Sequence, residues 1–243
     1  SLFLSLSHLI PSRIAAMLRL LFVSTVMVAS ASAADCTQAQ MDTIVNCYAA
    51  FHASYGANFP PLNPDYFEGF HRQRSNMQKE QGISAKPAIQ QYGATLTDCL
   101  KTVADCIVDS TYEKAPLSAS PGGDGHRYNL DRVQTAYECT EPGYSYQMRH
   151  FFCIDHFKSL DSATSTDPSR IMLTQCNTDY DTVKNNPAST DAQLCKAYQD
   201  NARCYGQVFN NYCGASEAGE FYCMLVSQEY RIWAPTCAFD CKY

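Results

Sequence analysis

Apolar residues recur every three or four positions along five stretches of the chain, the spacing that places them on one face of an α-helix. The clearest stretch runs from residue 190 to residue 214 and is rich in aromatic side chains. Strict alternation of apolar and polar residues, which marks a half-buried strand, does not occur over a comparable length. The sequence therefore predicts an all-α fold, with helices near residues 41–56, 95–107, 167–183, 190–214 and 217–230.

Helix-boundary residues support three of these starts. Residues 190–193 (TDAQ) and 95–98 (TLTD) have the spacing of a capping box, in which the first and fourth residues satisfy each other's free backbone amides. Asp167 followed by Pro168 fits an N-cap with proline at the first helical position. Gly214 stands where a C-cap glycine belongs.

Three stretches have the composition of connections between helices. The proline-rich residues 60–64 cannot be helical, and residues 115–125 are small and polar enough for a flexible connector. The small polar residues at 159–169 are a candidate boundary between an N-terminal unit, 34–158, and a C-terminal unit, 170–243. One disulfide-crosslinked helical bundle and two small helical units both remain open.

The amino-terminal region has the layout of a secretory signal. Residues 17–33 begin with a methionine and one arginine, continue with an apolar run at 20–28, and end in small residues up to Ala33. The run is shorter than the roughly 20 residues that span a bilayer, so a signal peptide is favoured over an anchor. We expect cleavage after Ala33, secretion to the extracellular space and no membrane span. Residues 1–16 contain no methionine and are interpreted as an upstream segment outside the fold.

All 13 cysteines follow the predicted cleavage site. In an oxidising compartment that density indicates a disulfide framework. The odd number predicts six disulfides with one free thiol, or six with one further bond in a disulfide-linked dimer. Six cysteines precede residues 159–169, so we expect a self-contained first set and place the unpaired cysteine in the second, with Cys241 as the candidate. The cysteines are Cys36, Cys47, Cys99, Cys106, Cys139, Cys153, Cys176, Cys195, Cys204, Cys213, Cys223, Cys237 and Cys241.

Helix geometry limits how these cysteines pair. On one helix, Cys99 and Cys106 would lie roughly 10 Å apart along the axis, beyond the roughly 7 Å between α-carbons that a disulfide allows. Cys195 and Cys204 are nine residues apart and face nearly opposite sides of their predicted helix. We therefore expect the disulfides to join one helix to another, in a connectivity that spacing alone leaves open.

Charge argues against nucleic acid as a partner. Removing the first 33 residues takes Arg13 and Arg19 from 18 basic residues and leaves 16 against 24 acidic ones, a net charge of −8. Phosphate backbones attract basic surfaces, and this chain has no basic stripe. It also has no glycine-rich phosphate loop and no HExxH or GxSxG motif. We expect no cofactor.

Cys153 and His156 form the most suggestive chemical cluster. Their Cys-x-x-His spacing resembles that of the secreted phospholipases A2. That family has paired cysteines before the motif and an aspartate directly after the histidine, whereas Phe152 and Phe157 stand at those places here. A zinc site would need a second close pair of ligands, and the remaining cysteines are assigned to disulfides. The sequence therefore predicts no catalytic residue and no metal.

The spacing of the later cysteines resembles a known group. Cys195 and Cys204-Tyr205 are followed by Cys213-Gly214-Ala215, Cys223 and Cys237, and residues 96–100 (LTDCL) with Cys106 lie upstream. This pattern is similar to the secreted cysteine-rich domains of nematodes, the chondroitin-proteoglycan type and related secreted domains of unknown function. The resemblance implies an all-helical extracellular module without catalytic residues. The glycan role is not implied, because the chain has no Ser-Gly dipeptide.

Three functions remain open. The first is a secreted non-enzymatic module with a binding or structural role, whose partner is an extracellular protein or a small ligand; the 16 tyrosines could supply contact surface. The second is a secreted hydrolase of unfamiliar type built on His156 and neighbouring acidic residues. The third is a matrix or surface component held by an intermolecular disulfide. Whether His150, Asp155 and His156 line an open pocket or lie against the core separates the first two.

Overall fold

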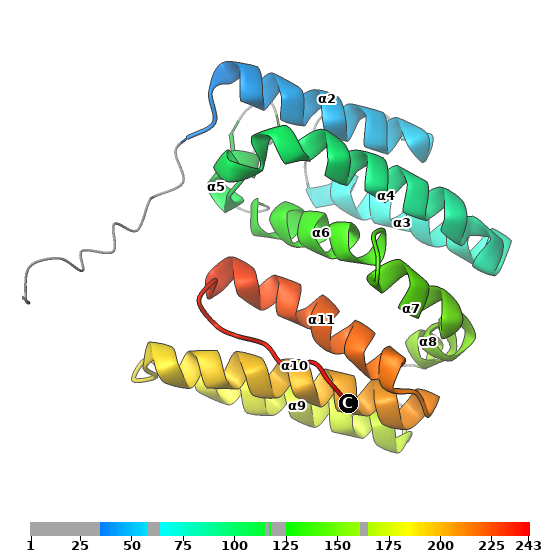
Figure 1. The fold of residues 1–243 in the computed structure, drawn as a ribbon, viewed down its shortest axis with the longest axis vertical. Coiled ribbons are helices and arrows are strands. Elements are labelled where there is room, and N and C mark those ends of the chain that lie inside the picture. The colour runs from blue at the N-terminus through cyan, green and yellow to red at the C-terminus, as the bar shows by residue number, and fades with distance from the viewer. Residues whose placement is uncertain (1–34, 58–63, 115–116, 118–124, 161–164) are drawn as a thin grey trace, which may run out of the picture. The chain divides into compact units, whose positions relative to one another are not determined.

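The computed structural model describes residues 35–57, 64–114, 117, 125–160 and 165–243, with only the backbone at 64–72. These residues form an all-α fold crosslinked by disulfides (Figure 1). None of the described helices is long and apolar enough to cross a bilayer. The elements are α2 (Gln38–Ser54), α3 (Pro64–Gln81), η1 (Gly82–Ala85), α4 (Lys86–Leu100), η2 (Lys101–Cys106), α5 (Asp109–Tyr112), α6 (Gly125–Glu138), α7 (Gly143–Arg149), α8 (Phe151–Ser159), α9 (Pro168–Lys184), α10 (Asp191–Cys213) and α11 (Ser216–Trp233).

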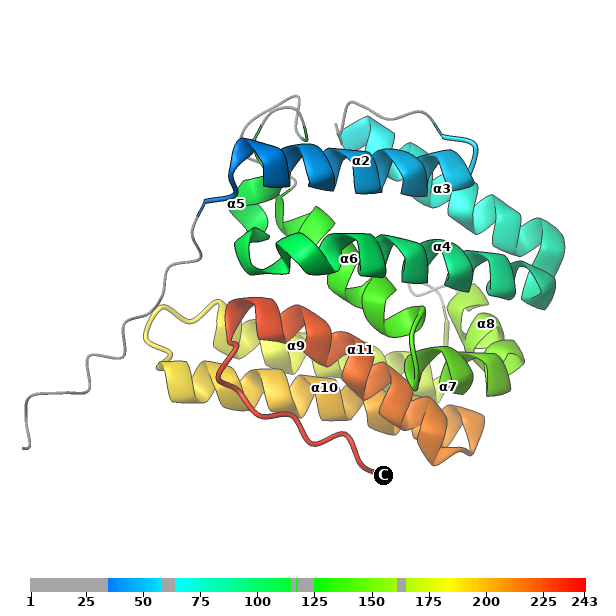
Figure 2. The same ribbon diagram turned by 45° about the horizontal axis from the view of Figure 1, so that its top comes forward.

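Six helices pack one against the next. α2 contacts α4, α4 contacts α6, α6 contacts α11, α11 contacts α10 and α10 contacts α9. Figure 2 shows α2 above α4 in the upper part of the view and α9, α10 and α11 in the lower part. Asp35–Tyr243 form one compact unit. The candidate boundary at 159–169 therefore lies inside this unit, between α8 and α9. The predicted signal at 17–33 and the upstream segment 1–16 lie outside the described residues, as do parts of the two connectors at 60–64 and 115–125.

The predicted helix ends are mostly confirmed. Thr190 and Gln193 form the capping box of α10, and Gly214 closes this helix in the left-handed conformation. Asp167 caps α9 by accepting a hydrogen bond from Ser169 N at 2.8 Å. The predicted start at Thr95 is wrong, because α4 begins nine residues earlier and the Thr95 hydroxyl donates to the Gln91 carbonyl within the helix.

Five of the described helices were not predicted from the sequence: α3, α5, α6, α7 and α8. α6 packs against both α4 and α11 and buries the polar residues Asn129 and Thr135, so no single apolar stripe marks it. α7 similarly buries Gln147. The opposite error occurs in α9, where Ile171 belongs to the expected apolar stripe but is 58% exposed. Burial of polar groups therefore obscured the apolar periodicity of α6 and α7. α8 is different, because its buried residues are all apolar and it was missed for its short length of nine residues.

Three apolar clusters form the core of the described residues. The first joins α2, α4, η2 and the residues up to α6, around the fully buried Ile44, Tyr48 and Tyr112. The second joins α8, α9, α10 and α11 around Val208 and Phe221. The third lies where the C-terminal tail packs on α10 and α11. α6 lies between the first two clusters, since its contacts include α4 and α11.

All disulfides lie within the chain, and each sulfur pair joins residues at least 18 positions apart. The Cys153–Cys213 bond crosses the candidate boundary, so the prediction of a self-contained N-terminal set is wrong. Cys241 is bonded to Cys223, and the free cysteine is Cys139. Cys241 finds a partner because the tail after α11 runs back along α10 and α11 (Figure 1). The six pairs are Cys36–Cys106, Cys47–Cys99, Cys153–Cys213, Cys176–Cys204, Cys195–Cys237 and Cys223–Cys241.

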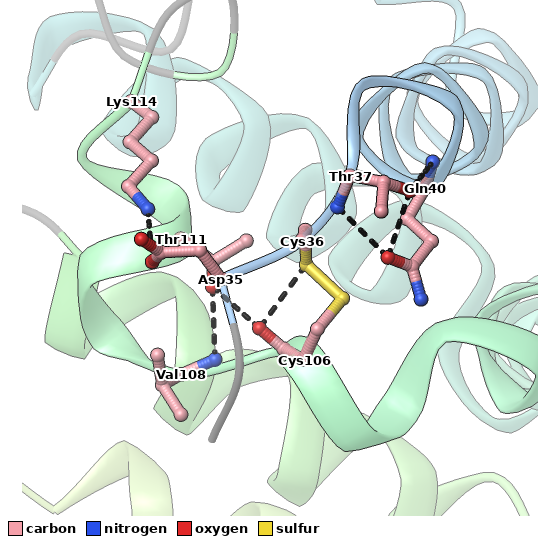
Figure 3. Close-up of polar contacts among 8 residues, drawn as sticks. All are labelled: Asp35, Cys36, Thr37, Gln40, Cys106, Val108, Thr111 and Lys114. Carbon is pink, nitrogen blue, oxygen red and sulfur yellow. Dashed lines mark hydrogen bonds and ion pairs between the residues drawn. A yellow bond between two sulfur atoms is a disulfide. The ribbon is translucent and has the colours of Figure 1, made fainter. Parts of the chain in front are cut away.

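Figure 3 shows how the first described residues are held. Cys36 is bonded to Cys106, and the next residue, Thr37, begins α2 with a capping box that includes Gln40. On the far side of the disulfide, the Thr111 hydroxyl donates to the Cys106 carbonyl at 2.8 Å and accepts from Val108 N at 3.1 Å. The chain is therefore fixed to η2 by a covalent bond just after the predicted cleavage site.

The thirteenth cysteine generates the first prediction. Cys139 is 2% exposed, and burial raises the pKa of its thiol to about 12, so the native protein should resist iodoacetamide at pH 8. Unfolding in guanidinium chloride without reductant should yield one carbamidomethyl group per chain, located at Cys139 by peptide mass mapping. A Cys139→Ala control should take up no label in either state. Labelling at Cys241, or a dimer that disappears on reduction, would contradict this assignment.

Candidate binding cavity

A cavity of about 650 Å³ lies where residues of α3, α4, α6, α7 and α8 meet. Its volume is in the range of pockets that hold small molecules, but its wall is unusual because every lining residue except Gly82 has a polar or charged side chain. Four of these side chains are cationic and three are anionic. The cationic ones are Arg74, Lys79, Lys86 and Lys158, and the anionic ones are Asp131, Glu138 and Asp155.

An ion-pair cluster on one wall joins α3 to α6. Arg74 Nη2 donates to Glu138 Oε2 at 2.8 Å, and Arg74 Nη1 lies 4.0 Å from Asp131 Oδ1. Burial by itself would raise the pKa of Glu138, but the positive charges of Arg74, Lys158 and Lys86 outweigh it and hold this pKa below its usual value. Glu138 is therefore ionised at neutral pH, and the cluster holds α3 against α6 by charge.

Lys86 differs from Arg74 because no carboxylate lies within ion-pair distance of it among the described residues. It opens α4, is only 4% exposed, and donates from Nζ to Gln147 Oε1 at 3.0 Å. The ring of Phe151 lies 5.6 Å from Nζ. Burial lowers the pKa of Lys86 to about 8; the charge of Glu138 opposes this shift, whereas those of Lys158 and Arg74 act in the same direction as burial. The cavity thus contains a buried amine that is only partly compensated.

α4 and α6, which both contribute residues to the cavity, approach each other closely at Gly93. A Cβ at Gly93 would lie 2.3 Å from Cys139 Sγ and 2.9 Å from Thr135 Cγ2, so only glycine permits this packing distance. Cys139 Sγ lies 3.6 Å from the Ile89 carbonyl, and Gln90 donates to the Cys139 carbonyl at 3.1 Å. Thr135 lines the cavity, is 2% exposed, and its hydroxyl has no hydrogen-bond partner among the described residues. An unsatisfied buried hydroxyl is unusual and costs stability.

The residues singled out for chemistry do not meet. His150 Nε2 lies 3.2 Å from Glu217 Oε2, and His156 Nδ1 lies 2.6 Å from the Tyr212 hydroxyl at the surface. Asp155 alone of the three residues lines the cavity. Cys153 is bonded to Cys213 in a disulfide, so it cannot bind a metal ion as a thiolate. Among the described residues, no group of three or more His, Cys, Asp and Glu side chains could hold a metal ion.

Two further hollows are built differently. One of about 520 Å³ lies beside Asp109, whose carboxylate accepts from Asn129 at 2.8 Å and contacts His126, the residue stacked on Trp233. The other, of about 420 Å³, lies among tyrosines of α9, α10 and α11, where Tyr230 donates to Asn201 at 2.6 Å. The second hollow is lined by Glu229, a carboxylate whose pKa is raised by burial, so it is less suited to an anion than the cavity beside Lys86.

The Arg74–Glu138 pair generates the second prediction. Arg74→Met should lower the free energy of unfolding by about 3–5 kcal/mol, because it leaves the Glu138 carboxylate buried without its main counter-charge. The double variant Arg74→Met/Glu138→Gln should recover much of the loss. Lys101→Met, which removes an exposed ion pair with Asp98, serves as the control and should change little. Urea titrations followed by circular dichroism measure all three.

The same variants predict a pH effect. The lowered pKa of Glu138 stabilises the native protein at neutral pH, and this contribution is lost as the pH falls through the native-state pKa. Arg74→Met should therefore show a smaller acid-side loss from this group than the unaltered protein. An identical pH dependence in the two proteins would show that Arg74 does not set the ionisation of Glu138.

Comparison with known proteins adds no relative: no family model matches the chain, and neither a curated protein nor a solved structure is significantly similar to it.

Proposed function

We propose that the protein is a secreted, non-enzymatic binding module whose ligand occupies the cavity between α3, α4, α6, α7 and α8. Secretion is supported by the composition of residues 17–33 and by six disulfides, since such bonds persist in oxidising compartments. These bonds are consistent with an extracellular cysteine-rich structure.

The observation that carries the proposal is the polar cavity itself. Folding brings charged side chains from residues 74–86, 131–138 and 155–158 around one space and leaves two of its polar groups, Lys86 and Thr135, incompletely satisfied. Burial of such groups is unfavourable unless they are paired. A ligand that supplies the missing partners would offset that cost, which is the physical basis for binding.

The alternative functions receive less support. A hydrolase built on His150, Asp155 and His156 would need these side chains in one site, and their partners lie in different places. A component held by an intermolecular disulfide would need an accessible thiol, whereas Cys139 is buried. Kinship with the nematode cysteine-rich domains remains a proposal based on cysteine spacing. A structure of such a domain with the equivalents of Cys195–Cys237 and Cys223–Cys241 bonded would support it.

A cavity-blocking variant tests the binding function. Ser75 lines the cavity on an exposed position of α3, so Ser75→Trp should fill part of the space without entering the core. Thr178→Trp, on the exposed face of α9, is the matched control. A library of small polar fragments, screened by amide chemical shifts, should perturb residues around Gln147 and Thr135. These shifts should persist in the control and disappear in Ser75→Trp.

Fragment binding spread over the surface, or the absence of any saturable binding at these residues, would refute the assignment of the cavity as the binding site. Equal shifts in the two tryptophan variants would refute it as well, because the blocked and unblocked cavities would then be equivalent.

A further inference from the structure

The charges around the cavity are unequal. Four cationic and three anionic side chains line it, which gives a surplus of one positive charge in a chain whose formal net charge is −6. Arg74 is compensated by Glu138 and Asp131. None of Lys79, Lys86 and Lys158 has an ion pair among the described residues, so the surplus resides on the lysines rather than on the arginine. Lys86 is the buried one among them.

Lys86 has donor capacity left over. A lysine ammonium carries three N–H donors and no acceptor. One donor bonds to Gln147 Oε1, and the Phe151 ring lies on another side of the ammonium at 5.6 Å from Nζ. The amine is nearly inaccessible from bulk water, with 4% of the residue exposed, and yet it lines a cavity of about 650 Å³. A ligand in that cavity is the group best placed to accept the remaining hydrogen bonds.

Thr135 supplies an independent second observation. Its hydroxyl comes from α6, a different element from Lys86, and is buried without a partner. A hydroxyl can donate one hydrogen bond and accept others. An ammonium and a hydroxyl on separate walls of one cavity match an oxyanion, which accepts from both, better than a neutral or cationic group.

We propose that the cavity binds a small organic anion through a carboxylate or phosphate group placed against Lys86, with Thr135 as a further donor. This inference rests on the proposed binding function and names the chemical class of its ligand. A carboxylate and a phosphate monoester share the acceptor oxygens and negative charge that the site demands. Charge-assisted hydrogen bonds are the strong ones, and a buried site screens them little.

Anion binding should be coupled to proton uptake. The native pKa of Lys86 is lowered to about 8 by burial, so part of the population is neutral at pH 8. An anion beside the amine favours the charged form and raises this pKa. Complex formation at pH 8 should therefore take up a fraction of a proton, and affinity should fall as the pH rises towards 10.

Isothermal titration calorimetry at pH 8 and low salt tests the proposal on the oxidised protein. The probes are benzoate and phenyl phosphate, with benzamide and phenol as uncharged counterparts. Repeating each titration in two buffers of different ionisation enthalpy counts the protons taken up. We expect saturable one-to-one binding of at least one anionic probe, at least tenfold weaker binding of its uncharged counterpart, and proton uptake. The stronger of the two anions identifies the preferred group.

Three variants identify the site. Lys86→Met should weaken anion binding at least tenfold and abolish the proton uptake, whereas Lys101→Met, an exposed lysine of η2, should leave both unchanged. Gln147→Glu keeps Lys86 but places a carboxylate at the position that accepts its hydrogen bond. This internal anion should compete with the probe and weaken its binding by a similar factor. Circular dichroism and thermal melts confirm that each variant is folded.

Anion binding that persists in Lys86→Met, or equal affinity for charged and uncharged probes, would overturn the inference. If polar fragments bind the cavity in the Ser75→Trp experiment while neither anion binds, the binding function stands and the anionic class is wrong. If neither fragments nor anions bind, both proposals fail.

Discussion

The contact between α4 and α6 at Gly93 is the constraint on which much of the bundle depends. Cys139 and Thr135 occupy the space where a side chain at position 93 would lie, so the two helices approach more closely than larger residues permit. This approach positions α6 to contact α11 on its other side and to connect the first apolar cluster to the second. It also places Thr135 and Glu138 on the cavity wall. Fold and candidate site therefore share one packing contact.

The disulfides crosslink some parts of the bundle more than others. Two bonds fix the N-terminal helices to each other: Cys36–Cys106 and Cys47–Cys99. Two others hold the C-terminal tail to α10 and α11, and one joins α9 to α10. Only Cys153–Cys213 ties the segment of the cavity that contains Asp155 and Lys158 to the C-terminal helices. Near Lys86 the cavity wall is held by hydrogen bonds and ion pairs rather than by a disulfide.

The sequence predicted the helical class, the six disulfides and the ends of α9 and α10, because capping residues and apolar stripes are local signals. Disulfide partners depend on tertiary structure, and for that reason the free cysteine was assigned to Cys241 instead of Cys139. The cavity was not foreseen at all. Folding alone brings together Arg74, Lys86 and Glu138, which are separated in the sequence. The buried polar residues of α6 do not recur at a regular spacing that the sequence would reveal. One local sign was present: Lys86 precedes Pro87 at a helix start, where a cation opposes the helix dipole.

The burial of Cys139 affects disulfide exchange during folding. Disulfides exchange when a thiolate attacks an existing bond, and Cys139 is the one thiol that six bonds leave over. In the unfolded chain this sulfur is exposed to solvent and can rearrange mispaired bridges. Once α4 closes over α6, the thiol is withdrawn behind Gly93 with its pKa raised to about 12, and intramolecular exchange loses its nucleophile. Completion of the fold therefore removes the chain's own thiol from exchange with its disulfides.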